Sequence, residues 1–384
     1  MWTGFSGRRE AGGEADHGGA RGNLQMLESV NEERRRFVGV AAAALGAARL
    51  GVLGSAVQQM ACAALTERDE GELPSLSGAT EWLNSPPLTS TGLRGKVVLV
   101  DFWTYTCVNW LRTLPYVRAW SDKYRDQGLV VIGAHTPEFP FEKDIDNVRW
   151  AAKQMDVRYP IAVDSDYGVW RAFHNNYWPA VYIADANGRV RFHYFGEGNY
   201  DGIERVIQRL LRDSGKQTDD QLVKVTPRGL EVAADYGTLR SPESYLGYEK
   251  AGAFASDAQQ DAPRTYIVPR LALNQWGLAG SWTVKGRAAV LNEANGRLVY
   301  RFHARDVNLI MGVPPGAQPV HFTVKVDGKP PGASHGEDSD AEGTGAAGRQ
   351  RTYQLVREQQ RIADREFEIQ FAEPGVEAFC FTFG

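Results

Sequence analysis

The chain has 384 residues, of which 43% are hydrophobic and 23% charged, an ordinary composition for a globular protein of two or three domains. Its formal net charge of −4 gives no reason to expect a nucleic-acid partner. The three cysteines, Cys62, Cys107 and Cys380, are too few for a disulfide framework, so a hydrophobic core must hold the fold together.

Residues 1–70 are predicted to be a disordered start followed by an export signal. Arg34, Arg35 and Arg36 precede Phe37 and Val38, and an apolar run over 39–56 follows that is too weak for a membrane span. Two arginines, any residue, then Phe and an aliphatic residue resemble a twin-arginine signal. We therefore expect an exported, periplasmic or extracytoplasmic protein. The alternative is a basic N-terminal helix that stays attached.

Strand and helix signals alternate through residues 71–215. Residues 96–102 (KVVLVDF) form a short apolar run typical of a buried strand. Apolar positions then recur at helical spacing from Cys107 to about Tyr124, and Pro115 is expected to kink that helix. Further strands are expected at 129–134, 160–163, 180–184 and 190–195, and further helices at 142–155, at 167–174 and from a cap at Asp201 to about Leu211. The order predicts an α/β domain with a mixed central sheet flanked by helices.

Cys107 begins the tetrapeptide Cys107-Val108-Asn109-Trp110 at the junction of the first buried strand and the following helix. The free N–H groups and positive dipole end of a helix N-terminus favour a thiolate. Because the thiolate is the nucleophile in thiol chemistry, this placement predicts a reactive sulfur.

Residues 77–215 resemble the thioredoxin superfamily, most closely its TlpA-like and DipZ-type exported members. The matching strings are FWTYTC at 102–107, RTLP at 112–115, VIGAHTPEF at 131–139 and YWPA at 177–180. The resemblance implies a thioredoxin-like fold, a cis-proline at Pro179 beside the reactive cysteine, and thiol chemistry at Cys107. The family usually carries a second cysteine where this chain has Trp110, so the resemblance does not extend to a dithiol site.

Short alternating runs separated by turn signals predict an all-β sandwich over 271–384, with 216–270 as a connecting segment. By resemblance this sandwich is the jelly-roll, carbohydrate-binding-module-like domain of DipZ-type proteins, which makes carbohydrate a candidate ligand there. Trp276, Trp282 and Tyr300 are candidates for sugar stacking or, alternatively, for core packing. The Gly-rich stretch 332–348 is expected to be a solvated, mobile insertion, with calcium binding as the alternative.

Five residues are candidates for the chemistry: Cys107, Thr104, Trp110, Pro179 and Glu138. Thr104 could bond the sulfur as in a peroxidatic site, Trp110 could cover the thiol or a bound substrate, and Glu138 could move protons. His135 is a further candidate for favouring the thiolate, and Thr106 or Asn109 could donate to the sulfur or cap the helix. Cys380 fits a sandwich core better than a resolving role. No metal-ligand spacing or cofactor motif is evident.

We therefore expect an exported thiol oxidoreductase that acts through a single cysteine. Its substrate would be a protein thiol or disulfide, a sulfenic acid or a peroxide, and an external thiol would complete the cycle. The alternative is a redox-inactive binding module that uses the thioredoxin groove and the sandwich to hold a peptide or carbohydrate.

Replacing both Arg34 and Arg35 with Lys should block export while leaving the protein folded in the cytoplasm, because twin-arginine transport reads the arginine pair and not only its charge. Fractionation of cells that express either form measures this. Replacing Arg8 and Arg9 in the same way serves as the control. Undiminished extracytoplasmic accumulation of the Arg34/Arg35 variant would remove the signal assignment.

Overall fold

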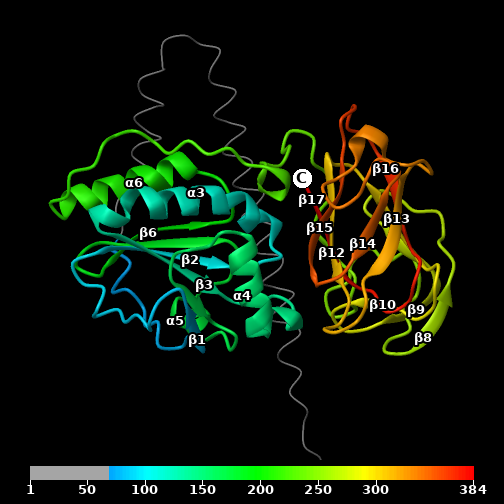
Figure 1. Cartoon of the computed structure of the whole chain (residues 1–384), viewed down its shortest axis with the longest axis horizontal. Helices are drawn as coiled ribbons and strands as arrows, with labels where there is room; N and C mark the ends of the chain where they lie inside the picture. Colours follow the sequence, from blue (N-terminus) through cyan, green and yellow to red (C-terminus); the bar gives the residue numbers. More distant parts are fainter. Residues whose placement is uncertain (1–68) are drawn as a thin grey trace, which may run out of the picture. The chain divides into compact units, whose positions relative to one another are not determined.

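A six-stranded mixed sheet forms the centre of the first half of the chain (Figure 1). The computed structural model describes residues 69–384, so Cys62 and the expected export signal lie outside the described residues. The strand order is β1 (Glu81–Leu83), β4 (Ile161–Val163), β3 (Leu129–His135), β2 (Val97–Trp103), β5 (Ala180–Ala184) and β6 (Val190–Phe195). The two pairs β2–β3 and β3–β4 are parallel and the others antiparallel, which confirms the expected mixed sheet.

Strand β2 is buried along its whole length because helices or loops cover both faces of the sheet. Its side chains alternate: Val97, Leu99 and Trp103 face one apolar cluster, and Val98, Val100 and Phe102 face another. The first cluster is closed by helices α3 (Val108–Tyr124), α4 (Ile145–Gln154) and α6 (Tyr200–Asp213). The second is closed by α5 (Gly168–Ala172) and by residues of the segment 73–93.

One local prediction is corrected in this half. Helix α6 has its N-cap at Asn199, with φ of 51°, and Asp201 lies in the first turn. Asn tolerates this left-handed conformation better than most residues, so the helix begins two residues earlier than the Asp cap suggests. Helix α3 runs from Val108 to Tyr124 with Pro115 inside it, and the expected kink at Pro115 stays a prediction.

The second half of the chain is one antiparallel sheet that curls on itself. Along its main path the order is β14 (Thr344–Ala347), β13 (Val320–Val326), β16 (Arg365–Phe371), β11 (Arg297–Phe302), β9 (Trp276–Val284), β10 (Ala289–Leu291), β17 (Glu377–Phe383), β12 (Asp306–Gly312) and β15 (Arg351–Arg357). Two short strands join at the side, β7 (Ser244–Tyr245) on β17 and β8 (Pro263–Tyr266) on β9. This confirms the predicted all-β class.

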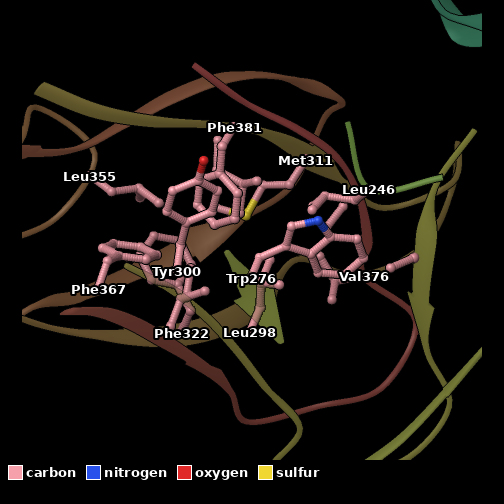
Figure 2. Packing of buried hydrophobic residues seen from close by; sticks show 14 of the residues in the cluster. Leu246, Trp276, Leu298, Tyr300, Met311, Phe322, Leu355, Phe367, Val376 and Phe381 are labelled. Carbon is pink, nitrogen blue, oxygen red and sulfur yellow. The ribbon is translucent and has the colours of Figure 1, made fainter. Parts of the chain in front are cut away.

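Strand β9 belongs to both layers of the curled sheet. Its residues 276–279 pair with β11, and its residues 280–284 pair with β8 or β10. Gly280 stands where the pairing changes, with φ of 91° that side chains rarely adopt. The layers enclose a core that includes Trp276, Tyr300, Phe322, Phe367 and Phe381, and the Trp276 indole lies beside Leu246 and Val376 (Figure 2). Trp276, Trp282 and Tyr300 are fully buried, which confirms core packing and excludes a surface platform for sugars.

The stretch 332–348 is an ordered part of the sandwich, contrary to the expected mobile insertion. It contains the short helix η5 (Gly332–Ser334) and strand β14, which pairs with β13. The Asp338 carboxylate accepts hydrogen bonds from Arg351 and from the backbone N–H of Gln354. Acidic residues here therefore fix the backbone of neighbouring strands.

The two halves share an apolar contact inside the single compact unit that spans Arg68 to Gly384. Phe139 and Phe141, which follow β3, pack on Phe379 of β17, with ring centroids 5.5 and 4.7 Å apart. Cys380 and Ile310 complete this cluster. The domain boundaries near residues 215 and 270 stay a prediction.

A chain cut after residue 225 should leave Phe139 and Phe141 without their partners on β17. We expect this fragment to melt at a lower temperature than the intact protein and to bind more of a hydrophobic dye, because the exposed rings lose their burial free energy. Calorimetry of the fragment and of the intact chain measures the difference. Equal melting temperatures would show instead that each half folds independently.

Candidate functional site at Cys107

Cys107 is the N-cap of α3, reached from β2 by a short turn. Its backbone N–H donates to the Thr104 carbonyl at 3.2 Å, and its own carbonyl accepts from the Leu111 N–H at 2.9 Å. The residue is partly exposed, and its Sγ lies 3.8 Å from the carbonyl oxygen of Trp178. The Trp178–Pro179 peptide bond is cis, as the resemblance implied. The fold thus brings together Cys107 and Pro179, which are far apart in the sequence.

The thiol of Cys107 has a pKa raised well above its usual value, contrary to the expected thiolate. Burial is the largest cause, followed by the negative charge of Glu243; Glu138 adds a smaller contribution of the same sign. The backbone N–H groups of Trp110 and Asn109 lower the pKa, as a helix N-terminus should, but burial outweighs them. The sequence predicted the helix end correctly and missed the burial and the two carboxylates.

Trp110 is completely buried and points into the core, which corrects the expectation that it covers the thiol or a substrate. Its indole Nε1 donates to Asp101 Oδ2 at 2.8 Å, and its ring stacks on Trp103 with centroids 4.3 Å apart. Burial raises the pKa of Asp101 to about 7, although the hydrogen bond from Trp110 opposes the shift. Trp110 is therefore a structural partner of a buried carboxyl group in β2.

His135 cannot favour a thiolate by its charge. It ends β3 in full burial, and neither of its ring nitrogens has a hydrogen-bond partner. Burial lowers its pKa to about 3, so the imidazole is neutral at physiological pH. Its ring packs edge-on against Trp103, with centroids 4.7 Å apart.

Glu142 anchors the loop that carries Cys107, a role that sequence reasoning missed. Its Oε1 accepts from the Thr106 hydroxyl at 2.6 Å, and its Oε2 accepts from the backbone N–H groups of Glu138 and Phe139. Burial raises the pKa of Glu142 to about 7, and the neighbouring hydroxyls of Thr104 and Thr106 oppose this shift. Thr106 therefore serves the loop and not the sulfur.

Thr104 is buried, and among the described hydrogen bonds none joins its hydroxyl to Cys107. Its hydroxyl makes no contact of normal hydrogen-bond geometry, yet it lies close enough to Glu142 to stabilise the ionised carboxylate. The expected peroxidatic arrangement of Thr104 with the sulfur is thus not formed. Asn109 accepts a long hydrogen bond from Arg112 at 3.5 Å.

Glu138 is held by residues of the second half. Its side chain is 8% exposed, and its Oε1 accepts from the Tyr245 hydroxyl at 2.5 Å and from Lys250 at 3.2 Å. Sequence reasoning found Glu138 but missed Tyr245 and Lys250, since more than a hundred residues separate them from it. No local pattern signals such a long-range contact.

Two hydrogen bonds connect the sandwich to the loop and helix that carry the thiol. The Thr352 hydroxyl in β15 donates to the carbonyl of Thr106, immediately before Cys107, at 2.7 Å. Arg112, in the first turns of α3, donates to the Phe383 carbonyl in β17 and pairs with Glu197, both at 3.0 Å. The loop and helix that carry Cys107 are therefore fixed from the second half of the chain.

Cys380 is fully buried with a free thiol, but it lies in the cluster of Phe139 and Phe379 where the two halves meet and not in the sandwich core as expected. Within residues 69–384 no group of three or more His, Cys, Asp or Glu side chains is arranged to hold a metal ion. Within the same residues no helix is long and apolar enough to cross a membrane.

Each half of the chain matches a known protein family. Residues 74–193 match the AhpC/TSA family, and residues 241–384 match the thioredoxin-like C-terminal domain. The chain is 32% identical to thiol-disulfide oxidoreductase YkuV of Bacillus subtilis over 142 residues, which cover 37% of this chain and 95% of YkuV. A solution structure of a thioredoxin-like protein in the oxidised form shares 32% identity, with 39% of this chain and 97% of that chain covered and a TM-score of 0.35.

The match to protein DipZ of Mycobacterium tuberculosis extends over both halves. The identity is 36% over 321 residues, which are 82% of this chain and 43% of DipZ. The chain thus spans less than half the length of these DipZ relatives. It belongs to the thioredoxin-like redoxins of the TlpA/DipZ type.

Asp101→Asn should remove one component of the pH dependence of stability. The folded-state pKa of Asp101 is raised from 3.8 to about 7, so its stabilising contribution is present below about pH 4 and is lost as pH rises through 7. Asparagine still accepts from Trp110 but does not ionise. The free energy of unfolding of the variant, relative to that of wild type, should therefore rise by roughly 2–4 kcal/mol between pH 4 and pH 8.

Urea unfolding at several pH values measures this difference. Asp126→Asn, at a side chain that is 91% exposed, is the matched control and should follow wild type. A difference between Asp101→Asn and wild type that does not vary with pH would contradict the assignment.

Proposed function

We propose that this chain is a thiol–disulfide oxidoreductase that works through Cys107 alone. The observation that carries the proposal concerns residue 110, where the family usually has its second cysteine. Trp110 fills it, buried and bonded to Asp101, while Cys107 stays partly exposed beside the Trp178 carbonyl. Among the relatives, YkuV and ResA of Bacillus are named thiol-disulfide oxidoreductases, which supports the reaction class.

The surroundings of Cys107 suit an extended substrate. In this arrangement the Trp178 carbonyl can accept a hydrogen bond from the backbone of a bound chain, in the manner of an added β-strand. The same geometry would place a substrate sulfur beside Sγ, which is 3.8 Å from that carbonyl. Pro179, buried next to it, has no N–H to donate.

The exchange balances with one protein sulfur. The Cys107 thiolate attacks one sulfur of a substrate disulfide, a new S–S bond forms, and the other substrate sulfur leaves as a thiolate that takes up the proton lost by Cys107. An external thiol then attacks the mixed disulfide, forms a disulfide with the substrate sulfur and returns Cys107 as a thiol. Trp110 contributes no sulfur, so the second step depends on this external thiol.

Peroxide reduction is the second candidate, favoured by the match of residues 74–193 to the AhpC/TSA family. Cys107 would then become a sulfenic acid, with water as the other product, and two external thiols would restore it. Thr104 lacks a bond to the sulfur, which weighs against this reading. A redox-inactive groove is less favoured, since it leaves the partly exposed thiol without a role.

An extracytoplasmic location remains part of the proposal and rests on Arg34 and Arg35.

Trp110→Cys should create a second thiol one helical turn after Cys107 and raise insulin reduction, because the new thiol can release the substrate from the mixed disulfide. Loss of the indole should also cost roughly 2–4 kcal/mol of stability through the cavity beside Trp103. Trp110→Ser leaves nearly the same cavity without a sulfur and is the matched control. Equal insulin reduction by the two folded variants would refute the proposed framework.

Cys107→Ser should abolish both mixed-disulfide formation and any peroxide consumption. Trapping with a fluorescent aromatic disulfide, followed by mass spectrometry, measures the adduct. Cys380→Ser serves as the control for the buried thiol and should retain the adduct at Cys107. Retention of full activity by Cys107→Ser would show that a residue other than Cys107 carries out the reaction.

A further inference from the structure

A buried ion pair joins helix α3 to the loop that follows β6. Arg112 Nη1 lies 3.0 Å from Glu197 Oε1, and the two side chains are 3% and 11% exposed. Burial raises the pKa of Glu197, and the positive charge of Arg112 opposes this shift. Because each charge compensates the other in a site that excludes most water, removing either side chain leaves an uncompensated buried charge.

The loop that carries Glu197 is also bonded to Pro179. Gly196, which precedes Glu197, donates its backbone N–H to the Pro179 carbonyl at 2.8 Å. Strand β6 leads into this loop and pairs along its length with β5, which begins directly after Pro179. The position of the Glu197 carboxylate is therefore linked to that of the Trp178–Pro179 segment.

On the other side of the ion pair, Arg112 is linked to the thiol. Arg112 lies in the first turns of α3, and Cys107 is the N-cap of that helix. The Leu111 N–H donates to the Cys107 carbonyl at 2.9 Å and so fixes the turn between them. Cys107 Sγ in turn lies 3.8 Å from the Trp178 carbonyl oxygen, which closes a ring of contacts. The ion pair therefore joins the two elements whose separation decides where a substrate backbone lies relative to the sulfur.

The second half of the chain holds the Arg112 guanidinium in this place. Its Nη2 donates to the Phe383 carbonyl in β17 at 3.0 Å, while its Nη1 donates to Glu197. A guanidinium can serve two separate acceptors because its donors form a rigid planar fork, whereas a lysine ammonium presents its donors from one atom. The Asn109 side chain accepts a further, long bond from Nη1 at 3.5 Å. Arg112 is thus oriented by β17 on one side and by Glu197 on the other.

We propose that Arg112 is a positioning residue that sets the separation between Cys107 and the Trp178–Pro179 segment for an extended polypeptide substrate. The inference rests on the proposed function for the nature of that substrate. A polypeptide needs both groups in the right relation, since its backbone bonds the Trp178 carbonyl while its sulfur meets Cys107. A small disulfide needs the sulfur alone. Loss of the Arg112–Glu197 pair therefore impairs the reaction with polypeptides selectively.

The test compares two stoichiometric reactions of Cys107 in the full chain. One reagent is the small symmetric disulfide of thionitrobenzoate, and the other is an extended peptide whose central cysteine carries one thionitrobenzoate in disulfide linkage. In both reactions the Cys107 thiolate forms a new S–S bond with the reagent and thionitrobenzoate leaves as a thiolate. Mass spectrometry of quenched samples counts the adduct at Cys107. A change in the pKa of the thiol alters both rates alike, so the ratio of the two rate constants reports the positioning.

Arg112→Gln should lower the ratio of the peptide rate constant to the small-disulfide rate constant by roughly ten- to a hundredfold, because a displacement of about 1 Å is sufficient for such a loss. Arg112→Lys keeps the charge without the fork and should give an intermediate ratio. Glu197→Gln should lower the ratio in the same direction and replaces the first variant if that one does not fold. Arg118→Gln is the matched control, since Arg118 also lies in α3 but pairs with Glu231 at 2.5 Å, and its ratio should equal that of wild type.

An unchanged ratio in the folded variants of the pair would overturn the inference. So would a loss of both rates by the same factor, which would indicate a general effect on the thiol. Turnover of insulin with an external thiol tests the proposed function separately. If this turnover is absent while the ratio falls in Arg112→Gln, the positioning role stands and the proposed function fails. If turnover occurs and the ratio does not change, the reverse holds.

Discussion

The hydrogen bond from Trp110 to Asp101 is the constraint on which the site depends. Asp101 lies in the central strand β2 with no exposed surface, and a buried carboxyl group needs a donor. The indole N–H is a donor only, and its ring fills the space above Trp103. One side chain therefore satisfies the carboxyl group, packs the first turn of α3 onto the sheet and leaves Cys107 as the single sulfur of the site.

The second constraint is that the surroundings of the thiol come from both halves of the chain. Thr352 fixes the carbonyl before Cys107, and Tyr245 orients Glu138 beside it. Helix N-termini ordinarily favour anions, but here burial and two carboxylates determine the state of the sulfur. The sandwich thus contributes to the surroundings of the thiol through hydrogen bonds and charge, while Trp276, Trp282 and Tyr300 belong to its own core.

Local patterns predicted the elements that local forces decide. The apolar run at β2 predicted the central strand, and the expected strands at 180–184 and 190–195 match β5 and β6, while the cis bond at Pro179 was implied by resemblance. Strands β12 and β15 were not predicted, because polar residues such as Asn308 and Thr352 are buried there and break the alternation of apolar and polar positions. The raised pKa of Cys107 was beyond sequence reasoning, since it depends first on burial in the folded chain and then on Glu243, which is distant in the sequence.

The contact of Phe139 and Phe141 with Phe379 has a consequence for synthesis of the chain. A ribosome completes the sheet of the first half long before it makes β17, and at about 5–20 residues per second the interval is on the order of ten to forty seconds. During that time the two rings lack their partner on β17. The nascent protein therefore exposes apolar surface that the finished protein buries, and chaperones would meet it in that state.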